Sequence, residues 1–244
     1  MTFFLLLRGV TALKSILELV AIPFPSAPYT RMRLFFLFYA LGIVNLLAEG
    51  SGTITGTVPL SESKKLDVPV GKYRGKISGK VDPSPAVVAA VWLESDRISA
   101  PKKPPEVTIA QQNYQFSQYL VIIPKGGKIY FPNKDSDYHN IYSLSKTKRF
   151  DLGRYKSSET PFPSVVFDKV GFVRLNCEIH DHMKANVVVV DSPYYGTTNQ
   201  LGRFSLKNIP AGDYILHAQM DRKTKWQMPI KVLAGKTLKI NFPK

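Results

Sequence analysis

The sequence contains few of the residues on which many cofactor sites and disulfide frameworks depend. Among its 244 residues there are one cysteine, Cys177, and four histidines. A single cysteine excludes an intramolecular disulfide, and it also excludes iron–sulfur clusters and zinc sites that take four cysteine ligands from one chain. Four histidines are too few for the multi-copper centres of oxidases. The lone cysteine therefore belongs either to the core or to a site with mixed ligands.

Nucleotide-binding signatures and acidic residues are also scarce. The sequence has no glycine loop of the P-loop type and no dinucleotide fingerprint. Only 18 Asp and Glu oppose 33 Lys and Arg, which gives a net charge of +15. Such a charge favours acidic partners or anionic surfaces. We expect no nucleic-acid partner, because the sequence has neither an arginine-rich run nor an aromatic stacking stripe.

The first 50 residues have the pattern of an export signal. An apolar run at 34–47 follows Arg31 and Arg33 and ends at the small-residue pattern of residues 48–50. This order is typical of a secretory signal peptide, and the run is short for a bilayer span of about 20 residues. Met32 directly precedes this signal, so translation from Met32 is one interpretation of the start.

The signal predicts a periplasmic or otherwise exported protein. A membrane hairpin formed with the apolar segments nearer the N-terminus is the alternative, although Glu18 and several prolines interrupt it. We expect contact with a membrane only through the N-terminal signal, if that signal remains uncleaved.

The chain after residue 50 is a succession of short β-type runs separated by Gly, Pro, Asn and Asp. No helical period lies between them, and their regular spacing predicts an all-β fold built from β-sandwiches. The expected strands are 52–58, 68–81, 86–93, 107–109, 119–123, 128–131, 140–144, 164–167, 172–177, 186–190, 203–206, 214–219, 226–232 and 237–242.

Residues 194–244 have a pattern of their own. Two alternating strands flank the turn of residues 208–213, but about four strands are too few to close a sandwich. This region resembles the carboxypeptidase regulatory-like, transthyretin-type β-sandwich, a module that opens with strands similar to GTITGTV and AVVAAVWLE of this chain. We therefore expect residues 51–100 to complete the C-terminal sandwich, with 101–193 inserted between its halves.

The candidate functional residues lie around the end of one expected strand. Val173, Leu175 and Cys177 share one face of that strand, which points Cys177 toward an apolar interior. A tight loop holding His180 and Met183 follows, and the chain then enters a strand of four valines. This order predicts a thiolate, an imidazole and a thioether around one point.

A fourth group is expected from His139, at the start of another strand. Two His and one Cys in a trigonal plane with a weak axial Met form the ligand set of a mononuclear electron-transfer copper site. Two alternatives remain open. One is a zinc site using His139, Cys177, His180 and His182, and the other is a core in which Cys177 is only a small buried hydrophobe. We expect His182 to face solvent beside the site, as a further candidate ligand.

With these residues, the region 101–193 resembles the cupredoxin family, a Greek-key β-sandwich, and its wider block is similar to cupredoxin-like proteins grouped with methylamine utilisation proteins. The loop Cys177-x2-His180-x2-Met183 is most similar to that of amicyanin, which has Pro where this chain has Asp181-His182. The resemblance implies one copper ion. The ligands that it implies are His139, Cys177, His180 and Met183, with Asn140 hydrogen-bonded across to the cysteine loop.

The resemblance further implies a carrier of single electrons that is not itself an enzyme. Electrons would leave through the His180 edge to a redox protein such as a cytochrome or a dehydrogenase. Three basic residues after the His139 strand, Lys146, Lys148 and Arg149, are a candidate docking site for an acidic partner. The alternatives are a copper-binding or copper-delivery protein without redox cycling, and a structural β-sandwich surface module.

Overall fold

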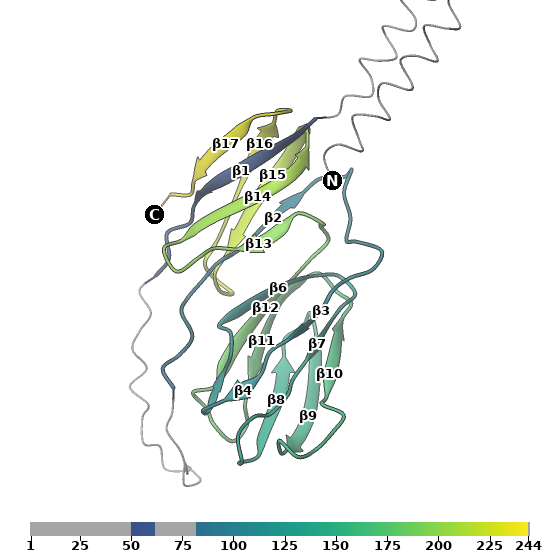
Figure 1. The fold of residues 1–244 in the computed structure, drawn as a ribbon, viewed down its shortest axis with the longest axis vertical. Coiled ribbons are helices and arrows are strands. Elements are labelled where there is room, and N and C mark those ends of the chain that lie inside the picture. Colours follow the sequence, from purple (N-terminus) through teal and green to yellow (C-terminus); the bar gives the residue numbers. More distant parts are fainter. Residues whose placement is uncertain (1–49, 62–81, 244) are drawn as a thin grey trace, which may run out of the picture. The chain divides into compact units, whose positions relative to one another are not determined.

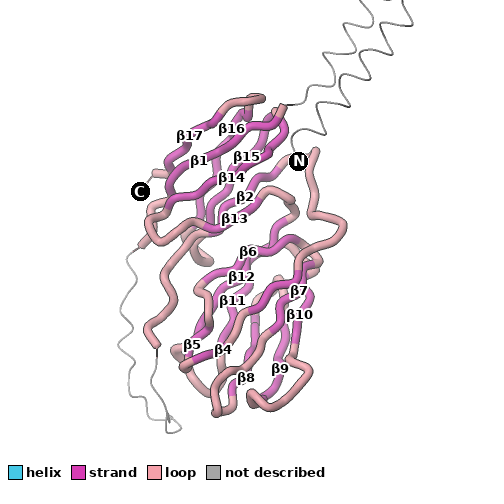
Figure 2. Tube along the Cα trace, viewed as in Figure 1, coloured by secondary structure: helices cyan, strands magenta, loops and turns pink. Residues whose placement is uncertain are grey.

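The computed structural model describes residues 50–61 and 82–243. The export-like segment and the expected strand at 68–81 lie outside the described residues. Within them every regular element is a β-strand and none is a helix, so the fold class is all-β (Figures 1 and 2). The described part of the chain accordingly offers no long apolar helix as a membrane span.

Seventeen strands make up the described structure. In chain order they are β1 (Ser51–Thr57), β2 (Ala90–Glu94), β3 (Glu106–Thr108), β4 (Gln111–Gln112), β5 (Gln115–Phe116), β6 (Leu120–Pro124), β7 (Gly127–Tyr130), β8 (His139–Leu144), β9 (Arg149–Tyr155), β10 (Ser164–Phe167), β11 (Gly171–Asn176), β12 (Lys184–Val190), β13 (Tyr195–Thr197), β14 (Arg203–Pro210), β15 (Gly212–Gln219), β16 (Lys225–Val232) and β17 (Thr237–Asn241).

Strands β3 to β12 form one sandwich. Its five-stranded sheet has the order β6-β12-β11-β8-β9, and its three-stranded sheet has the order β10-β7-β3. The core between these sheets contains large apolar side chains from both, including Ile129, Phe167 and Leu175. The short β4–β5 hairpin forms a two-stranded sheet of its own, and Gln111 of β4 makes an isolated bridge to Asn133. Its Tyr114 and Phe116 nevertheless belong to the same core.

The register of this sandwich decides which side chains face its interior. β11 pairs with β12 in antiparallel register, and Val173, Leu175 and Cys177 are buried in the core, as the alternation in the sequence predicts. β8 pairs with β9, with a register irregularity between Asn140 and Tyr142. Such irregularities change the direction of side chains next to functional sites, and this one immediately follows His139.

The remaining strands form a second sandwich, with sheets β14-β1-β17 and β13-β2-β15-β16. β1 lies between β14, to which it is antiparallel, and β17, to which it is parallel. β2 pairs with β13 and β15. Strands that precede residue 101 are thus hydrogen-bonded to strands that follow residue 194, around a separate core that includes Ile54, Leu93 and Leu216.

A third apolar cluster joins the two sandwiches. It combines Ala90 of β2 with Leu120 and Ile122 of β6 and with Val188 and Val190 of β12. The other two valines of β12 face the core of the first sandwich. Because both faces of β12 are covered, its four consecutive valines are all buried, which is why this strand reads as a continuous apolar run.

Four strands were not expected from the sequence, namely β4, β5, β9 and β13. The longest of these is β9, in which Tyr155 is buried and Phe150 and Leu152 pack partly buried against the core, while four of its residues are exposed. The expected strand at 86–93 is shorter than predicted and begins at Ala90. β4, β5 and β13 have only two or three residues, and β9 is mostly exposed, so their alternation signal is weak and the sequence pattern did not reveal them.

Candidate metal centre

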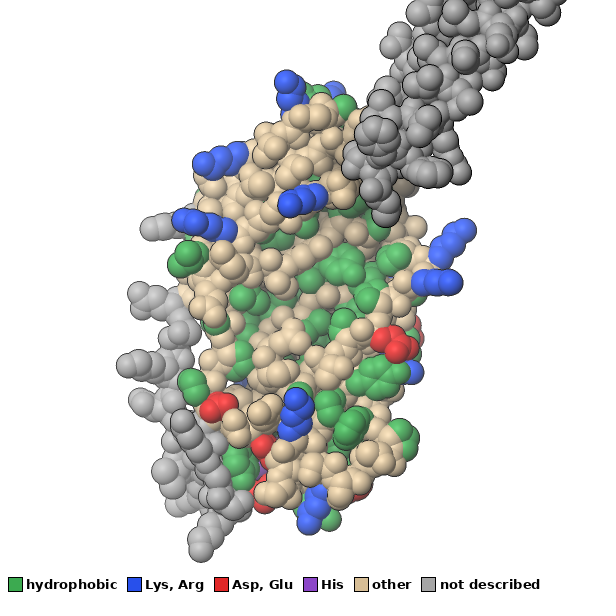
Figure 3. All heavy atoms as spheres, in the orientation of Figure 1, with side chains coloured by type: hydrophobic (Ala, Val, Ile, Leu, Met, Phe, Trp, Pro, Cys, Tyr) green, Lys and Arg blue, Asp and Glu red, His purple; other side chains and the backbone are tan. Residues whose placement is uncertain are grey.

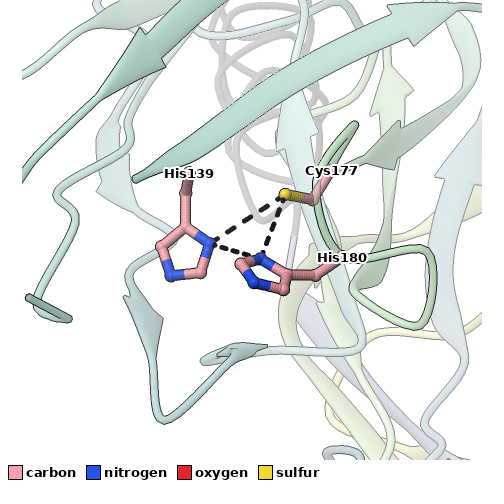
Figure 4. Close-up of side chains that lie close together, drawn as sticks. All are labelled: His139, Cys177 and His180. Atoms are coloured by element: carbon pink, nitrogen blue, oxygen red, sulfur yellow. Dashed lines mark hydrogen bonds between the residues drawn. The ribbon is translucent and has the colours of Figure 1, made fainter. Parts of the chain in front are cut away.

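Three side chains from two distant stretches of the chain meet at one buried point (Figure 4). Nδ1 of His139 lies 3.1 Å from Nδ1 of His180. The sulfur of Cys177 lies 3.9 Å from Nδ1 of His139 and 3.8 Å from Nδ1 of His180. All three residues are buried, with exposed fractions of 0%, 2% and 8% for His139, Cys177 and His180.

This triangle of donor atoms has the size that a metal ion requires. A point in its plane lies about 2.1 Å from all three atoms, close to the roughly 2.0–2.3 Å of metal–nitrogen and metal–sulfur bonds in proteins. Each pair of atoms is too far apart for van der Waals overlap and too close to admit a water between them. One thiolate and two imidazoles are soft and borderline donors, a set that suits copper and zinc and is unsuited to calcium or magnesium.

The backbone around β8, β11 and β12 places these donors. His139 begins β8, and Cys177 directly follows the last residue of β11. The loop that carries His180 is closed by two backbone hydrogen bonds, from Met183 N–H to the His180 carbonyl at 2.9 Å and from Cys177 N–H to the Met183 carbonyl at 3.2 Å. Met183 is fully buried in the same core cluster as Cys177. Its role as an axial ligand stays a prediction.

Asp135 fixes the orientation of His139, and the sequence reasoning missed it. Its Oδ2 lies 2.8 Å from Nε2 of His139, so this carboxylate oxygen accepts the Nε2 proton. The lone pair of the imidazole is thereby left on Nδ1, the atom that faces Cys177 and His180. The signal available in the sequence was an acidic residue four positions before the histidine, in the loop that leads into β8.

Asn140 reaches from β8 to the loop that follows Cys177. Its Oδ1 accepts a hydrogen bond from the Glu178 backbone N–H at 3.3 Å. Its side-chain nitrogen donates to Asp151 at 2.6 Å and to the Gly153 carbonyl at 3.2 Å. Asn140 therefore holds the cysteine loop against β8 and β9, which limits changes in the separation between His139 and Cys177.

The expectation that His182 faces solvent is wrong. His182 is buried, and its Nε2 lies 2.9 Å from the backbone carbonyl oxygen of Tyr114. The three-residue group of close donor atoms consists of His139, Cys177 and His180 and does not include His182. Its neighbour Asp181 is exposed, whereas His182, in the same turn, lies inside the fold.

Burial controls the protonation of the centre. It raises the pKa of the Cys177 thiol, and the backbone N–H groups of Asn140, His180 and Ile179, which point at the sulfur, partly oppose that rise. Burial, together with the neighbouring His139 and His182, lowers the pKa of His180 to about 4. At neutral pH, His180 is therefore neutral and the thiol carries its proton, so binding of a metal to the thiolate must release that proton.

The basic residues Lys146, Lys148 and Arg149 lie away from this centre. Lys146 and Lys148 lie in the turn between β8 and β9, and Arg149 is the first residue of β9. All three are at the opposite end of β8 from His139, a distance of roughly 17 Å at about 3.3 Å per residue. Lys148 forms an ion pair with Asp168 at 2.8 Å. On the face drawn in Figure 3, Lys and Arg side chains are spread over both sandwiches rather than gathered in one patch.

The remaining histidine, His217, lies in the second sandwich. It stacks on Trp92 with a centroid separation of 4.8 Å and pairs with Glu94 at 2.7 Å. These contacts fit the structural role expected for it from the sequence.

Comparisons with known proteins give limited overlap. No family model matches the chain, and no curated protein matches it. Among solved structures, it is similar to a Cu-containing nitrite reductase from Thermus scotoductus, with 22% identity over 34% of this chain and 22% of that chain and a TM-score of 0.32. The P52G mutant of amicyanin in its reduced Cu(I) form matches with 16% identity over 34% of this chain and 81% of that chain, with a TM-score of 0.32. A pseudoazurin from Sinorhizobium meliltoi matches with 18% identity over 36% of this chain and 76% of that chain, with a TM-score of 0.29.

Proposed function

We propose that this protein is an exported, non-enzymatic carrier of single electrons that holds one copper ion with His139, Cys177 and His180, with Met183 as a weak axial ligand. The observation that supports this most directly is the triangle of two imidazole nitrogens and one sulfur, with sides of 3.1, 3.8 and 3.9 Å. When bound, copper supplies a reversible one-electron couple.

The protein contributes a set of donors that serves both oxidation states. The Cys177 thiolate favours Cu(I), while the imidazoles of His139 and His180 bind either state. The strands and the bonded loop around them limit how far these donors move when the charge of the ion changes. A site that keeps its shape lowers the structural cost of electron exchange, which is the property that a carrier needs.

Export is supported by the signal-like pattern of residues 31–50. An exported carrier of this kind exchanges electrons with other redox proteins. The +15 net charge favours partners with acidic surfaces.

Metal loading and the visible spectrum test this function. The full chain, expressed with its N-terminal segment and purified, is reconstituted with Cu(II). We expect one copper per chain and an intense blue colour from thiolate-to-copper charge transfer, and loss of both in Cys177→Ser. His217→Gln is the matched control, because it removes a partly buried histidine of the second sandwich and should leave the colour unchanged.

Two results would contradict the proposal in different ways. A colourless protein that binds only Cu(I) would support copper storage or delivery without redox cycling. Copper binding that is unchanged in Cys177→Ser would reject the site assignment itself.

A further inference from the structure

A single aromatic side chain lies against both imidazoles of the candidate metal centre. The ring of Tyr114 meets the ring of His180 edge-on at a centroid distance of 5.1 Å and the ring of His139 at 5.9 Å. Tyr114 is only 4% exposed and belongs to the same core cluster as Cys177. It comes from the turn of the β4–β5 hairpin, outside the two large sheets of the sandwich.

The backbone of the hairpin is fixed in an unusual conformation at this residue. Asn113 and Tyr114 have φ angles of 51° and 57°, in the left-handed region that side chains other than glycine seldom adopt. Their two N–H groups donate to the carboxylate of Asp135, at 2.7 Å and 3.0 Å. That carboxylate also accepts from His139, so one acidic side chain holds both the ligand and the residue that lies over it.

The side chain of Tyr114 is held separately at its far end. Its hydroxyl donates to Asp137, and its backbone carbonyl oxygen lies 2.9 Å from Nε2 of His182. Ring, backbone and hydroxyl are thus all attached to the segments that carry the donors, the loop before β8 and the loop after β11. These contacts hold the Tyr114 ring in one position beside the two imidazoles.

We propose that Tyr114 closes the metal centre against water and small external ligands and thereby restricts it to electron exchange without ligand binding. This inference rests on the proposed function. It assigns to Tyr114 the role of keeping the site an electron carrier, because a copper site open to solvent could bind a substrate. Replacing Tyr114 with Ala removes a phenol ring beside both imidazoles, which leaves room for several waters at about 30 Å³ each. Alanine meets the same backbone restriction at this φ angle as tyrosine, so the substitution tests the ring itself.

The first test uses the metal-free protein and its only cysteine. The rate at which a soluble disulfide reagent modifies the Cys177 thiol is measured in the native full chain. We expect Tyr114→Ala to react at least 10-fold faster than the wild type, whereas Tyr114→Phe, which keeps the ring and loses the hydroxyl, should react within about 3-fold of it. Tyr138→Ala is the matched control, because Tyr138 adjoins His139 and is 46% exposed.

The second test uses the copper-loaded protein and azide. The wild-type and Tyr114→Phe spectra should not change with added azide, while Tyr114→Ala should develop a new charge-transfer band and release copper to a chelator at least 10-fold faster. A folded Tyr114→Ala protein that behaves like Tyr138→Ala in both tests would overturn the inference.

If Tyr114→Ala does not fold, as judged by circular dichroism, Tyr114→Gly decides, because glycine also removes the ring and adopts the left-handed conformation without strain: a thiol reaction at least 10-fold faster supports the inference, and an unchanged rate overturns it. A wild-type protein without a blue band would reject the proposed function. The thiol test would still show separately whether Tyr114 shields Cys177.

Discussion

The carboxylate of Asp135 offers the sharpest test of how the centre is organised. It accepts three hydrogen bonds, from His139 Nε2–H at 2.8 Å and from the backbone N–H groups of Asn113 at 2.7 Å and Tyr114 at 3.0 Å. The change Asp135→Asn keeps the shape of the side chain but replaces one acceptor oxygen with a donor NH2 group. At least one of the three donors then faces another donor.

The size of the effect follows from these contacts. A buried donor left without its acceptor costs about 1–3 kcal/mol, so the unfolding free energy of the metal-free protein should fall by roughly that amount. Loss of the carboxylate also frees His139 to turn and to change its tautomer. Removal of such a partner typically lowers metal affinity about 10–100-fold, and neutralising a negative charge beside the ion should raise its reduction potential.

Urea unfolding of the metal-free protein and competition for copper with a chelator measure the two effects. Asp181→Asn is the matched control, because Asp181 adjoins His180, is exposed, and loses the same charge. A copper affinity for Asp135→Asn within about 2-fold of that of Asp181→Asn would refute the reasoning, because charge alone would then explain the whole change.

Two predictions concern the second sandwich. Gly56→Ala should lower the unfolding free energy in urea by more than about 2 kcal/mol, because a Cβ at Gly56 would lie 1.6 Å from the Ile240 carbonyl oxygen. Gly196→Ala, whose nearest neighbour lies at 3.6 Å, should change it by less than about 1 kcal/mol, and equal effects would contradict the model of β1–β17 packing. Burial holds the pKa of His217 below its ordinary value of 6.5, and the nearby Glu94 partly opposes this effect. As the pH falls, His217 is therefore protonated in the unfolded chain before it is protonated in the folded protein. The folded protein accordingly loses stability below about pH 6.5. The loss of stability between about pH 8 and pH 5 should be smaller in His217→Gln, and an unchanged loss would show that His217 does not contribute.

Much of the fold was predictable because it depends on local alternation. The strand pattern of Val173, Leu175 and Cys177 predicted which face of β11 is buried, and the all-β class followed from the spacing of such runs. The short loop to His180 was equally local. That His139 lies beside this loop depends on the pairing of β8 with its neighbours across the sheet, which the spacing of residues does not encode.

Other parts of the centre were hidden for physical reasons. Tyr114 sits in a hairpin whose strands have two residues each, too short for any period to show. In the sequence, Asp135 is indistinguishable from other polar loop residues. Its role depends on the left-handed turn at Asn113 and Tyr114, which directs their two N–H groups at its carboxylate. His182 was misjudged because its partner is a backbone carbonyl 68 residues away in the chain, which the local sequence does not reveal.

The parallel pairing of β1 with β17 has a consequence for biogenesis. Thr57 and Asn241, which hydrogen-bond across this pair, are 184 residues apart in the chain. The chain must therefore be made through Asn241 before the outer seam of that sandwich can close. The sandwich that carries the candidate metal centre, whose strands are contiguous between residues 106 and 190, is complete earlier. Until β14 and β17 are made, both edges of the early strand β1 lack partners, so a chaperone that shields this strand would raise the yield of folded protein.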